Sequence, residues 1–197
     1  MRASTRREFV AGPAGRIECA VDEPDGPARG VALVAHPHPL FGGTLDNKVV
    51  QTLARAFVEL GYETWRPNFR GVGETDGVHD EGRGELDDLE AVLKSIRTEK
   101  FILAGFSFGA SLAAKLAERA KPEWLVLVGV GLTRIMAPPV PPGSLVIHGE
   151  SDDTVPLAVV MDWARPQELP VVVVPGADHF FHRKLHILRA LVERNAQ

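Results

Sequence analysis

Continuous apolar runs alternate with segments of helical period along most of the chain. Six runs have the length of a strand and are bounded by glycine, proline or polar residues: 31–35, 62–65, 101–106, 124–130, 144–148 and 170–174. Between several of them, apolar residues recur every three or four positions, which predicts helices over 47–60, 86–96, around Leu112 and Leu116, and over 182–195. Strands that are apolar on both faces and alternate with amphipathic helices are typical of parallel βαβ units.

The first part of the chain follows a different pattern. Segments 7–11 and 16–21 flank Gly12-Pro-Ala-Gly15, a sequence typical of a hairpin turn. We therefore expect a three-layer α/β fold with a mostly parallel sheet of eight strands or slightly fewer, flanked by helices, in which the first two strands are antiparallel at one edge. The proline-rich segment 137–143 indicates a stiff connection and not a linker between domains, so residues 1–197 are expected to form a single domain.

Composition narrows the class of protein. A length of 197 residues suits one core, and 22 Lys and Arg against 26 Asp and Glu leave a net charge of −4. This charge provides no basic field for nucleic acid or for an anionic membrane, and no apolar run is long enough to cross a bilayer. The basic N-terminal segment leads into no apolar region, and the single cysteine, Cys19, allows no internal disulfide. We expect a cytoplasmic protein without membrane insertion.

The segment Gly105-Phe-Ser-Phe-Gly109 lies between a predicted strand and a predicted helix. Ligands of parallel α/β sheets bind at the carboxyl ends of the strands, where this segment falls. A Gly-x-Ser-x-Gly turn in that context is so sharp that the residues two before and two after the serine must lack a Cβ. The turn presents the hydroxyl of Ser107 at a helix N-terminus, where backbone N–H groups favour a developing oxyanion. Ser107 is therefore a candidate nucleophile, and a glycine-rich turn without chemistry is the alternative.

A serine nucleophile needs a base and a group that orients the base. Acidic residues follow the strand at 144–148, in Glu150-Ser-Asp-Asp153, and His179 follows the strand at 170–174. Serine, acid and histidine thus come in the chain order that a hydrolase of this architecture requires, each just beyond the carboxyl end of its own strand. The sequence predicts a serine hydrolase whose acid lies in this loop.

With these motifs the chain resembles the α/β-hydrolase superfamily, and within it the small, cap-less proteins that are similar to dienelactone hydrolase. The resemblance extends from about Val31 to the last predicted helix. It rests on the serine turn, on His148-Gly-Glu-Ser-Asp-Asp-Thr-Val-Pro156 and on Gly176-Ala-Asp-His179. The superfamily's pattern implies that Asp152, three residues after the glycine of His-Gly, is the acid, with Asp153 as the alternative. It likewise implies that His179 is the base.

Two backbone N–H donors are expected to hold the oxyanion. One is the N–H of Phe108, directly after the candidate nucleophile. The other is expected from the loop His36-Pro-His-Pro-Leu-Phe-Gly-Gly43, which departs from the His-Gly-x sequence usual in the superfamily. Because proline has no N–H, the remaining candidates are His38, Leu40 and Phe41, and of these we choose Leu40.

Histidines raise the alternative of a metal site. His36 and His38 form His-x-His, and His179, His182 and His186 follow one another at helical spacing. Because His179 already has a role as base and the two residues after it are expected on an exposed helix face, we predict neither a metal nor an organic cofactor.

The remaining polar residues near the site are expected to be structural. Gly71-Val-Gly73 lacks the rest of a phosphate-binding motif, and the resemblance implies that the segment around it braces the floor of the site. Asn47 is expected to cap the helix that follows it. The full set with structural roles comprises His36, Asn47, Asn68, Arg70, Gly71 and His148.

Only residues 131–143 separate the strand at 124–130 from the next, too few and too proline-rich for a cap. The site is therefore expected to be open and shallow, with apolar walls from Phe41, Phe106, Phe108, Phe180 and Phe181. Such a site suits small or exposed carboxylic esters, cleaved through an acyl-enzyme. Thioesters, amides or peptides are alternative substrates, and a non-catalytic binding protein is the alternative class. The apolar stripe of the last helix or an exposed sheet edge also permits a homodimer.

Overall fold

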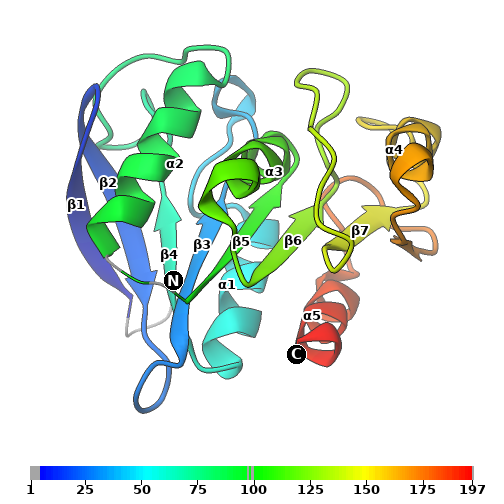
Figure 1. Cartoon of the computed structure of the whole chain (residues 1–197), viewed down its shortest axis with the longest axis horizontal. Helices are drawn as coiled ribbons and strands as arrows, with labels where there is room; N and C mark the ends of the chain where they lie inside the picture. The colour runs from blue at the N-terminus through cyan, green and yellow to red at the C-terminus, as the bar shows by residue number, and fades with distance from the viewer. Residues whose placement is uncertain (1–4, 97, 99, 197) are drawn as a thin grey trace.

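Eight strands form one sheet in the computed structural model of the protein, which describes residues 5–96, 98 and 100–196. The strand order is β1-β2-β4-β3-β5-β6-β7-β8 (Figure 1). β2 pairs with β1 and β4 in the antiparallel sense, whereas all neighbouring strands from β4 to β8 are parallel. The strands are β1 (Arg6–Gly12), β2 (Gly15–Asp22), β3 (Gly30–Ala35), β4 (Tyr62–Pro67), β5 (Phe101–Phe106), β6 (Trp124–Val128), β7 (Leu145–Gly149) and β8 (Val171–Val174).

Helices cover both faces of the sheet, as the alternation of apolar runs and helical periods predicts. α2 (Arg83–Ile96), α3 (Phe108–Ala120) and α4 (Leu157–Ala164) pack on one face, and α1 (Lys48–Glu59) and α5 (Leu185–Asn195) pack on the other (Figure 1). Each layer has its own apolar cluster, because alternate residues of the buried strands point to opposite faces. Along β3, for example, Leu33 joins the first cluster and Val34 joins the second. The prediction of a three-layer α/β fold with an antiparallel edge hairpin is confirmed.

Two helices differ from the sequence prediction. The last helix begins at Leu185 and not at residue 182, because Phe181 and Arg183 take positive φ values of 54° and 60° that helices do not accommodate. α4 is absent from the prediction altogether. Its eight residues include Val159 and Val160, which favour strands, and only Val160 and Ala164 are buried, so the sequence shows no clear helical period there.

The connection between β6 and β7 carries no cap. Residues 131–143 form an extended loop whose backbone is tied to the α4 region: Trp163 Nε1 donates to the carbonyl of Ala137 at 3.1 Å, and the N–H of Val140 donates to Gln167 Oε1 at 2.9 Å. The carboxyl ends of the parallel strands are therefore left open on this side of the molecule.

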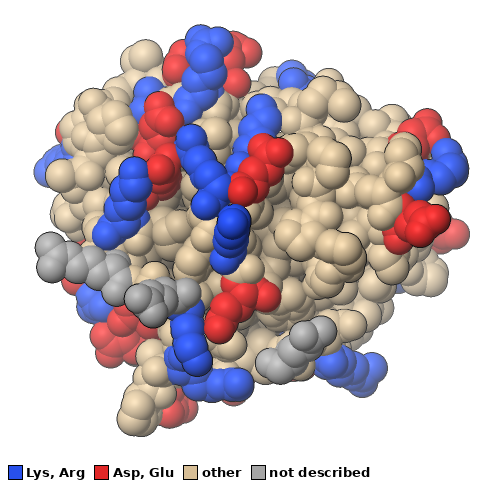
Figure 2. All heavy atoms as spheres, viewed as in Figure 1, with Lys and Arg blue, Asp and Glu red and all other residues tan. Residues whose placement is uncertain are grey.

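Charged side chains of both signs are interspersed on the face that carries α2 and α3 (Figure 2). Several of them pair, since Glu90 binds both Lys94 at 2.8 Å and Arg119 at 2.6 Å. Among the described residues of this face, positive and negative side chains therefore partly neutralise one another. Within the described part of the chain, no helix is long and apolar enough to cross a membrane.

Candidate active site

Ser107 stands at the turn between β5 and α3, with the backbone dihedral angles φ 55° and ψ −118°. This conformation is strained for a residue with a side chain and is typical of functional turns. The neighbouring glycines make the turn possible. A Cβ on Gly105 would lie 2.3 Å from the carbonyl oxygen of Gly109, and a Cβ on Gly109 would lie 2.4 Å from that of Ala35. The expected close approach of strand and helix is therefore present between β5 and α3 at Gly105, and at Gly109 the helix also lies against the end of β3.

A chain of hydrogen bonds joins the three predicted site residues. The hydroxyl of Ser107 donates to Nε2 of His179 at 3.0 Å, and Nδ1 of His179 donates to Oδ2 of Asp152 at 2.7 Å. His179 and Asp152 are 3% and 6% exposed, so the imidazole and the carboxylate interact largely out of water. Their order matches that of a nucleophile, a base and an orienting acid.

The second carboxylate oxygen of Asp152 fixes the direction of its side chain. Oδ1 accepts from the backbone N–H groups of Thr154 at 3.0 Å and Val155 at 2.8 Å. Asp153 is exposed and reaches only the hydroxyl of Thr154, at 3.5 Å. Of the two aspartates left open by the sequence, the structure brings Asp152 to the histidine.

His148 contacts the loop that carries Asp152. Its Nε2 lies 2.9 Å from the carbonyl oxygen of Val155, and burial lowers the pKa of the imidazole. A neutral ring with its proton on Nε2 therefore donates to that carbonyl. The expectation that His148 is a hydrogen-bonded structural residue is confirmed.

His179 is held on the loop after β8. The N–H of Ser151 donates to the carbonyl of Ala177 at 2.9 Å, which joins the acid loop to the histidine loop. The imidazole of His179 also packs against the rings of Phe106 and Phe180, at centroid distances of 4.9 and 5.2 Å. His179 is thus positioned by both a backbone contact and ring packing.

The loop after β3 is anchored by His36. Its Nε2 accepts the N–H of Phe69 at 2.9 Å, so the proton must lie on Nδ1, which donates to the carbonyl of Pro37 at 2.6 Å. Burial lowers the pKa of His36 to about 3. The ring is therefore neutral and locks the start of this loop against the loop after β4, in agreement with the structural role expected for it.

The structure does not bring Leu40 to Ser107. Residues Pro39–Phe41 form a short 3₁₀ helix, in which the N–H of Leu40 donates to Nδ1 of His38 at 3.3 Å. The side chain of Leu40 is 68% exposed, and the residue does not line the cavity at Ser107. The N–H of Phe41 is also occupied, because it donates to the carbonyl of His38 at 3.1 Å.

His38 differs from both of these candidates. It lines the cavity with Ser107 and Phe108, and within the described residues no acceptor binds its N–H. The N–H of Phe108 is likewise without an acceptor in the described chain, as expected at the first position of α3. His38 is thus the loop residue that the geometry favours as the second donor.

Two residues at this end of the site were missed in the sequence. His79 packs its ring against those of His38 and Phe108, at centroid distances of 4.8 and 5.8 Å. Its Nδ1 lies 2.8 Å from Oε1 of Glu85, a fully buried carboxylate that also accepts from the N–H groups of Asp80 and Gly82. His79 belongs to no motif in the sequence. Glu85 lies in the amphipathic pattern of α2, where a polar residue is expected on the exposed face, so its burial could not be foreseen.

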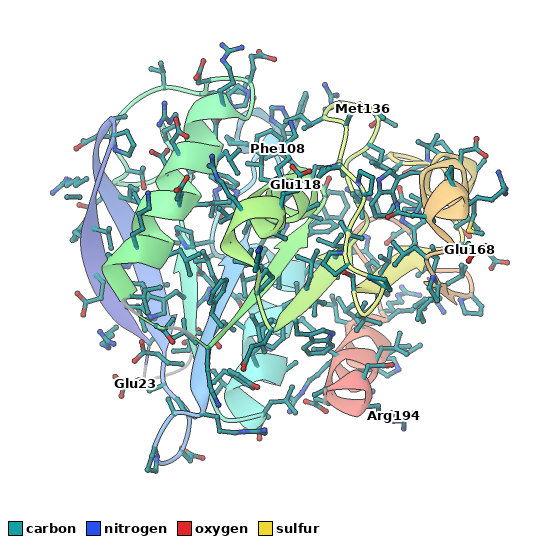
Figure 3. All side chains as sticks on the ribbon, in the orientation of Figure 1. Glu23, Phe108, Glu118, Met136, Glu168 and Arg194 are labelled. Atoms are coloured by element: carbon teal, nitrogen blue, oxygen red, sulfur yellow. The ribbon has the colours of Figure 1, made fainter. Side chains whose placement is uncertain are left out.

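The cavity above Ser107 has a volume of about 280 Å³. Phe41, Phe108 and Phe180 line it, whereas Phe106 and Phe181 are fully buried beneath it. Figure 3 shows Phe108 at the end of the molecule where the 131–143 loop, which carries Met136, also lies. The other lining residues are Pro37, His38, Gly42, Gly43, Asn47, Ser107, Gly131, Thr133, Arg134, Thr154, Val155 and His179.

The polar residues around the site hold its framework. Asn47 Oδ1 accepts from the N–H of Val49 at 2.9 Å and so caps α1 as expected. Arg70 forms a two-point ion pair with Asp88, at 2.8 Å for each contact. Asn68 accepts from the N–H of Leu45 at 2.9 Å, which ties the loop after β4 to the loop after β3.

The remaining histidines and the cysteine lie away from this chemistry. His182 and His186 are exposed, and His182 binds Asp178 at 2.7 Å. Cys19 is fully buried in β2, and burial raises the pKa of its thiol to about 12. Across the described residues, no group of three or more His, Cys, Asp or Glu side chains is arranged to hold a metal ion.

Comparisons with known proteins agree with this geometry. The model of the alpha/beta hydrolase family matches residues 33–144. An uncharacterized protein of Rickettsia prowazekii (strain Madrid E) is 33% identical over 196 residues, which cover 89% of this chain and 82% of the relative. The chain therefore belongs to the alpha/beta hydrolase family.

Solved structures add that the relatives include serine hydrolases. XC6422 from Xanthomonas campestris, described as an α/β serine hydrolase without a lid, has a TM-score of 0.91 and 37% identity, covering 99% of this chain and 94% of its own. An alpha-beta serine hydrolase homologue from Coxiella burnetii has a TM-score of 0.87 and 39% identity, covering 98% and 97%. The resemblance to small, cap-less hydrolases is confirmed.

Proposed function

We propose that this protein is a serine esterase that cleaves small or exposed carboxylic esters. The observation that carries the proposal is the hydrogen-bonded chain from Ser107 through His179 to Asp152 beneath an accessible cavity. Ser107 Oγ attacks the ester carbonyl as its proton passes to Nε2 of His179, and a tetrahedral intermediate forms. The carbon–oxygen bond to the alcohol then breaks while His179 returns the proton to the leaving group. Asp152 orients and stabilises the imidazolium.

Backbone donors hold the negative charge that develops on the carbonyl oxygen. We assign them to the N–H groups of Phe108 and His38, in place of the Leu40 that the sequence favours. An oxyanion-hole donor must point at the reacting oxygen with no competing acceptor, and the N–H of Leu40 already donates to His38 Nδ1. Water then attacks the acyl-enzyme with His179 as base, which releases the acid and restores Ser107.

The dimensions of the site favour small acyl groups. A cavity of about 280 Å³ falls at the lower limit of ordinary ligand sites, and no cap extends it. Phe41, Phe108 and Phe180 supply apolar contact near the serine. Long acyl chains would extend beyond the walls into water, so we expect the specificity constant to fall as the acyl chain lengthens.

Thioesters and amides are the alternative substrates, because the same three residues can serve both. Rates with short p-nitrophenyl esters, the corresponding acyl-CoA thioesters and p-nitroanilides would rank the three bonds. A clear excess of kcat/KM for the thioester or the anilide would replace the ester assignment. The other expectations from the sequence, namely a cytoplasmic location, no nucleic-acid partner and a homodimer, stay predictions.

The test of the proposal is labelling with a fluorophosphonate together with turnover of p-nitrophenyl acetate. Wild-type protein should react in both assays, and Ser107→Ala should lose both. Ser111→Ala is the matched control: Ser111 lies one turn further along α3, and its buried hydroxyl has no partner in the described chain. It should retain labelling and turnover. A folded wild type that neither reacts nor turns over would refute the esterase and favour a binding protein.

A further inference from the structure

We propose that Arg134 makes this site selective for esters that carry a carboxylate, such as monoesters of small dicarboxylic acids. The inference rests on the proposed function, because it names the substrate class for the same serine. Arg134 lies on the cap-less loop after β6 and lines the cavity together with Ser107 and His179.

The charge of the cavity wall supports this assignment. Among the described residues that line the cavity, Arg134 is the single Lys, Arg, Asp or Glu. Asp152 lies behind His179 and does not line the cavity, and its carboxylate is already bound by three donors. A substrate in the cavity therefore meets one positive charge and no facing acid, which favours an anion.

His38, which lines the cavity with Arg134, adds no second charge to the cavity wall. His38 has a lowered pKa, chiefly because of burial and then because of the charges of His79 and Arg134, which outweigh the opposite effect of Glu81 and Glu85. It is therefore neutral at ordinary pH, and Arg134 is the cation of the wall.

The guanidinium of Arg134 is positioned but not neutralised. Its central carbon lies 4.3 Å from the ring centroid of Phe41, a cation–π contact. Glu81 lines the adjoining recess with Arg134, yet among the described residues the guanidinium forms no ion pair with an Asp or Glu. A contact with an aromatic ring uses none of the N–H groups as hydrogen-bond donors to oxygen, so they stay available for a carboxylate.

The location of Arg134 also fits the reaction. It lies on the cavity wall and takes no part in the hydrogen bonds of Ser107, His179 and Asp152. A carboxylate bound there would orient the ester without entering the bond-making steps. We therefore assign to Arg134 a role in specificity and not in proton transfer.

The experiment compares two esters of similar length, only one of which carries a charge. p-Nitrophenyl hemiglutarate ends in a carboxylate, and p-nitrophenyl valerate is an uncharged ester of similar length. We expect wild type to favour the hemiglutarate, and Arg134→Gln to lower its kcat/KM about tenfold through KM while the valerate rate stays within about twofold. Arg134→Lys should lie between the two, since it keeps the charge but loses the planar fork.

Arg55→Gln is the matched control, because it removes one exposed positive charge from α1, away from the cavity. It should leave the ratio of the two rates unchanged. The inference is overturned if Arg134→Gln changes both esters equally or neither, or if Arg55→Gln reduces the ratio as much. In those cases hydrolysis of the valerate shows that the esterase function still stands.

A binding measurement separates the two proposals when turnover is absent. Monomethyl glutarate should bind to Ser107→Ala, and its dissociation constant by calorimetry should rise about tenfold when Arg134→Gln is added. Equal affinity for the single and double variants would overturn the inference, whether or not the wild type hydrolyses any ester.

Discussion

Oδ2 of Asp152 lies 2.7 Å from Nδ1 of His179, whereas the next residue in the chain, Asp153, is exposed and has no contact with the histidine. The pair therefore offers a matched test of the acid. Asp152→Asn should keep the hydrogen-bonding geometry but remove the charge that stabilises the imidazolium. We expect kcat for p-nitrophenyl acetate to fall by roughly 10⁴-fold, the size of the loss that the same change causes in a serine protease.

The control for this prediction is Asp153→Asn, which should stay within about twofold of wild type, as ordinary surface substitutions do. Circular dichroism of both variants would show that each is folded. A larger loss of kcat in Asp153→Asn than in Asp152→Asn would contradict the assignment of the acid.

Gly109→Ala should destabilise the protein and disturb the serine turn. The added Cβ would lie 2.4 Å from the carbonyl oxygen of Ala35 and 2.5 Å from that of His36, and these backbone atoms cannot move without shifting β3. Overpacking of this kind costs about 1–3 kcal/mol. Urea unfolding should show this loss in the free energy of unfolding, and turnover should fall with it.

Gly143→Ala provides the comparison, because a Cβ at Gly143 meets no heavy atom within 4 Å. Its effect on the free energy of unfolding should stay within about 0.5 kcal/mol. Equal stability of the two alanine variants would show that α3 and the end of β3 do not approach as closely as the structure indicates.

The backbone of the site could be predicted from the sequence because each of its loops has a local signal. The glycines around Ser107 report a close approach of strand and helix, and the order of serine, acid and histidine follows from the strands that carry them. The choice between Asp152 and Asp153 came from the resemblance to a family. The position in the loop left the choice open, because two adjacent residues lie at nearly the same place in the chain and differ in where their side chains point.

The contacts of the backbone N–H groups in the loop after β3 could not be predicted, because residue spacing does not encode them. Nothing in the sequence of the loop shows that the side chain of His38 turns back to accept the N–H of Leu40. His79 and Arg134 were also missed, since each comes from a loop without a motif and reaches the site only through the folded chain. Sequence patterns placed the strands, whereas side-chain direction in irregular loops required the structure.

The oxyanion donors can be located by trapping the serine with a phosphonate. In a crystal structure of the adduct, the phosphoryl oxygen should lie about 2.7–3.1 Å from the backbone nitrogens of His38 and Phe108. The nitrogen of Leu40 should keep its contact with His38. An oxygen bound to Leu40 and not to His38 would restore the residue that the sequence favours.

The free energy of unfolding should fall as the solution is acidified below pH 6.5, in part because of His36. Its Nε2 accepts the N–H of Phe69, so a proton can bind there only if that contact breaks, and the folded pKa is about 3. The unfolded chain binds this proton near pH 6.5, which favours unfolding as the pH falls from 6.5 towards 3. At pH 5 the loss from this one residue is about 2 kcal/mol.

His148, whose pKa burial also lowers, adds to the loss in the same direction. Urea unfolding at pH 7 and pH 5 would measure the total effect, and the imidazole resonances would identify its source. We expect the resonances of His36 to keep their chemical shifts down to pH 5. A titration of His36 with a midpoint above pH 5 would mean that the ring is accessible to protons, and the lock between the loops after β3 and β4 would then be weaker than its hydrogen bonds indicate.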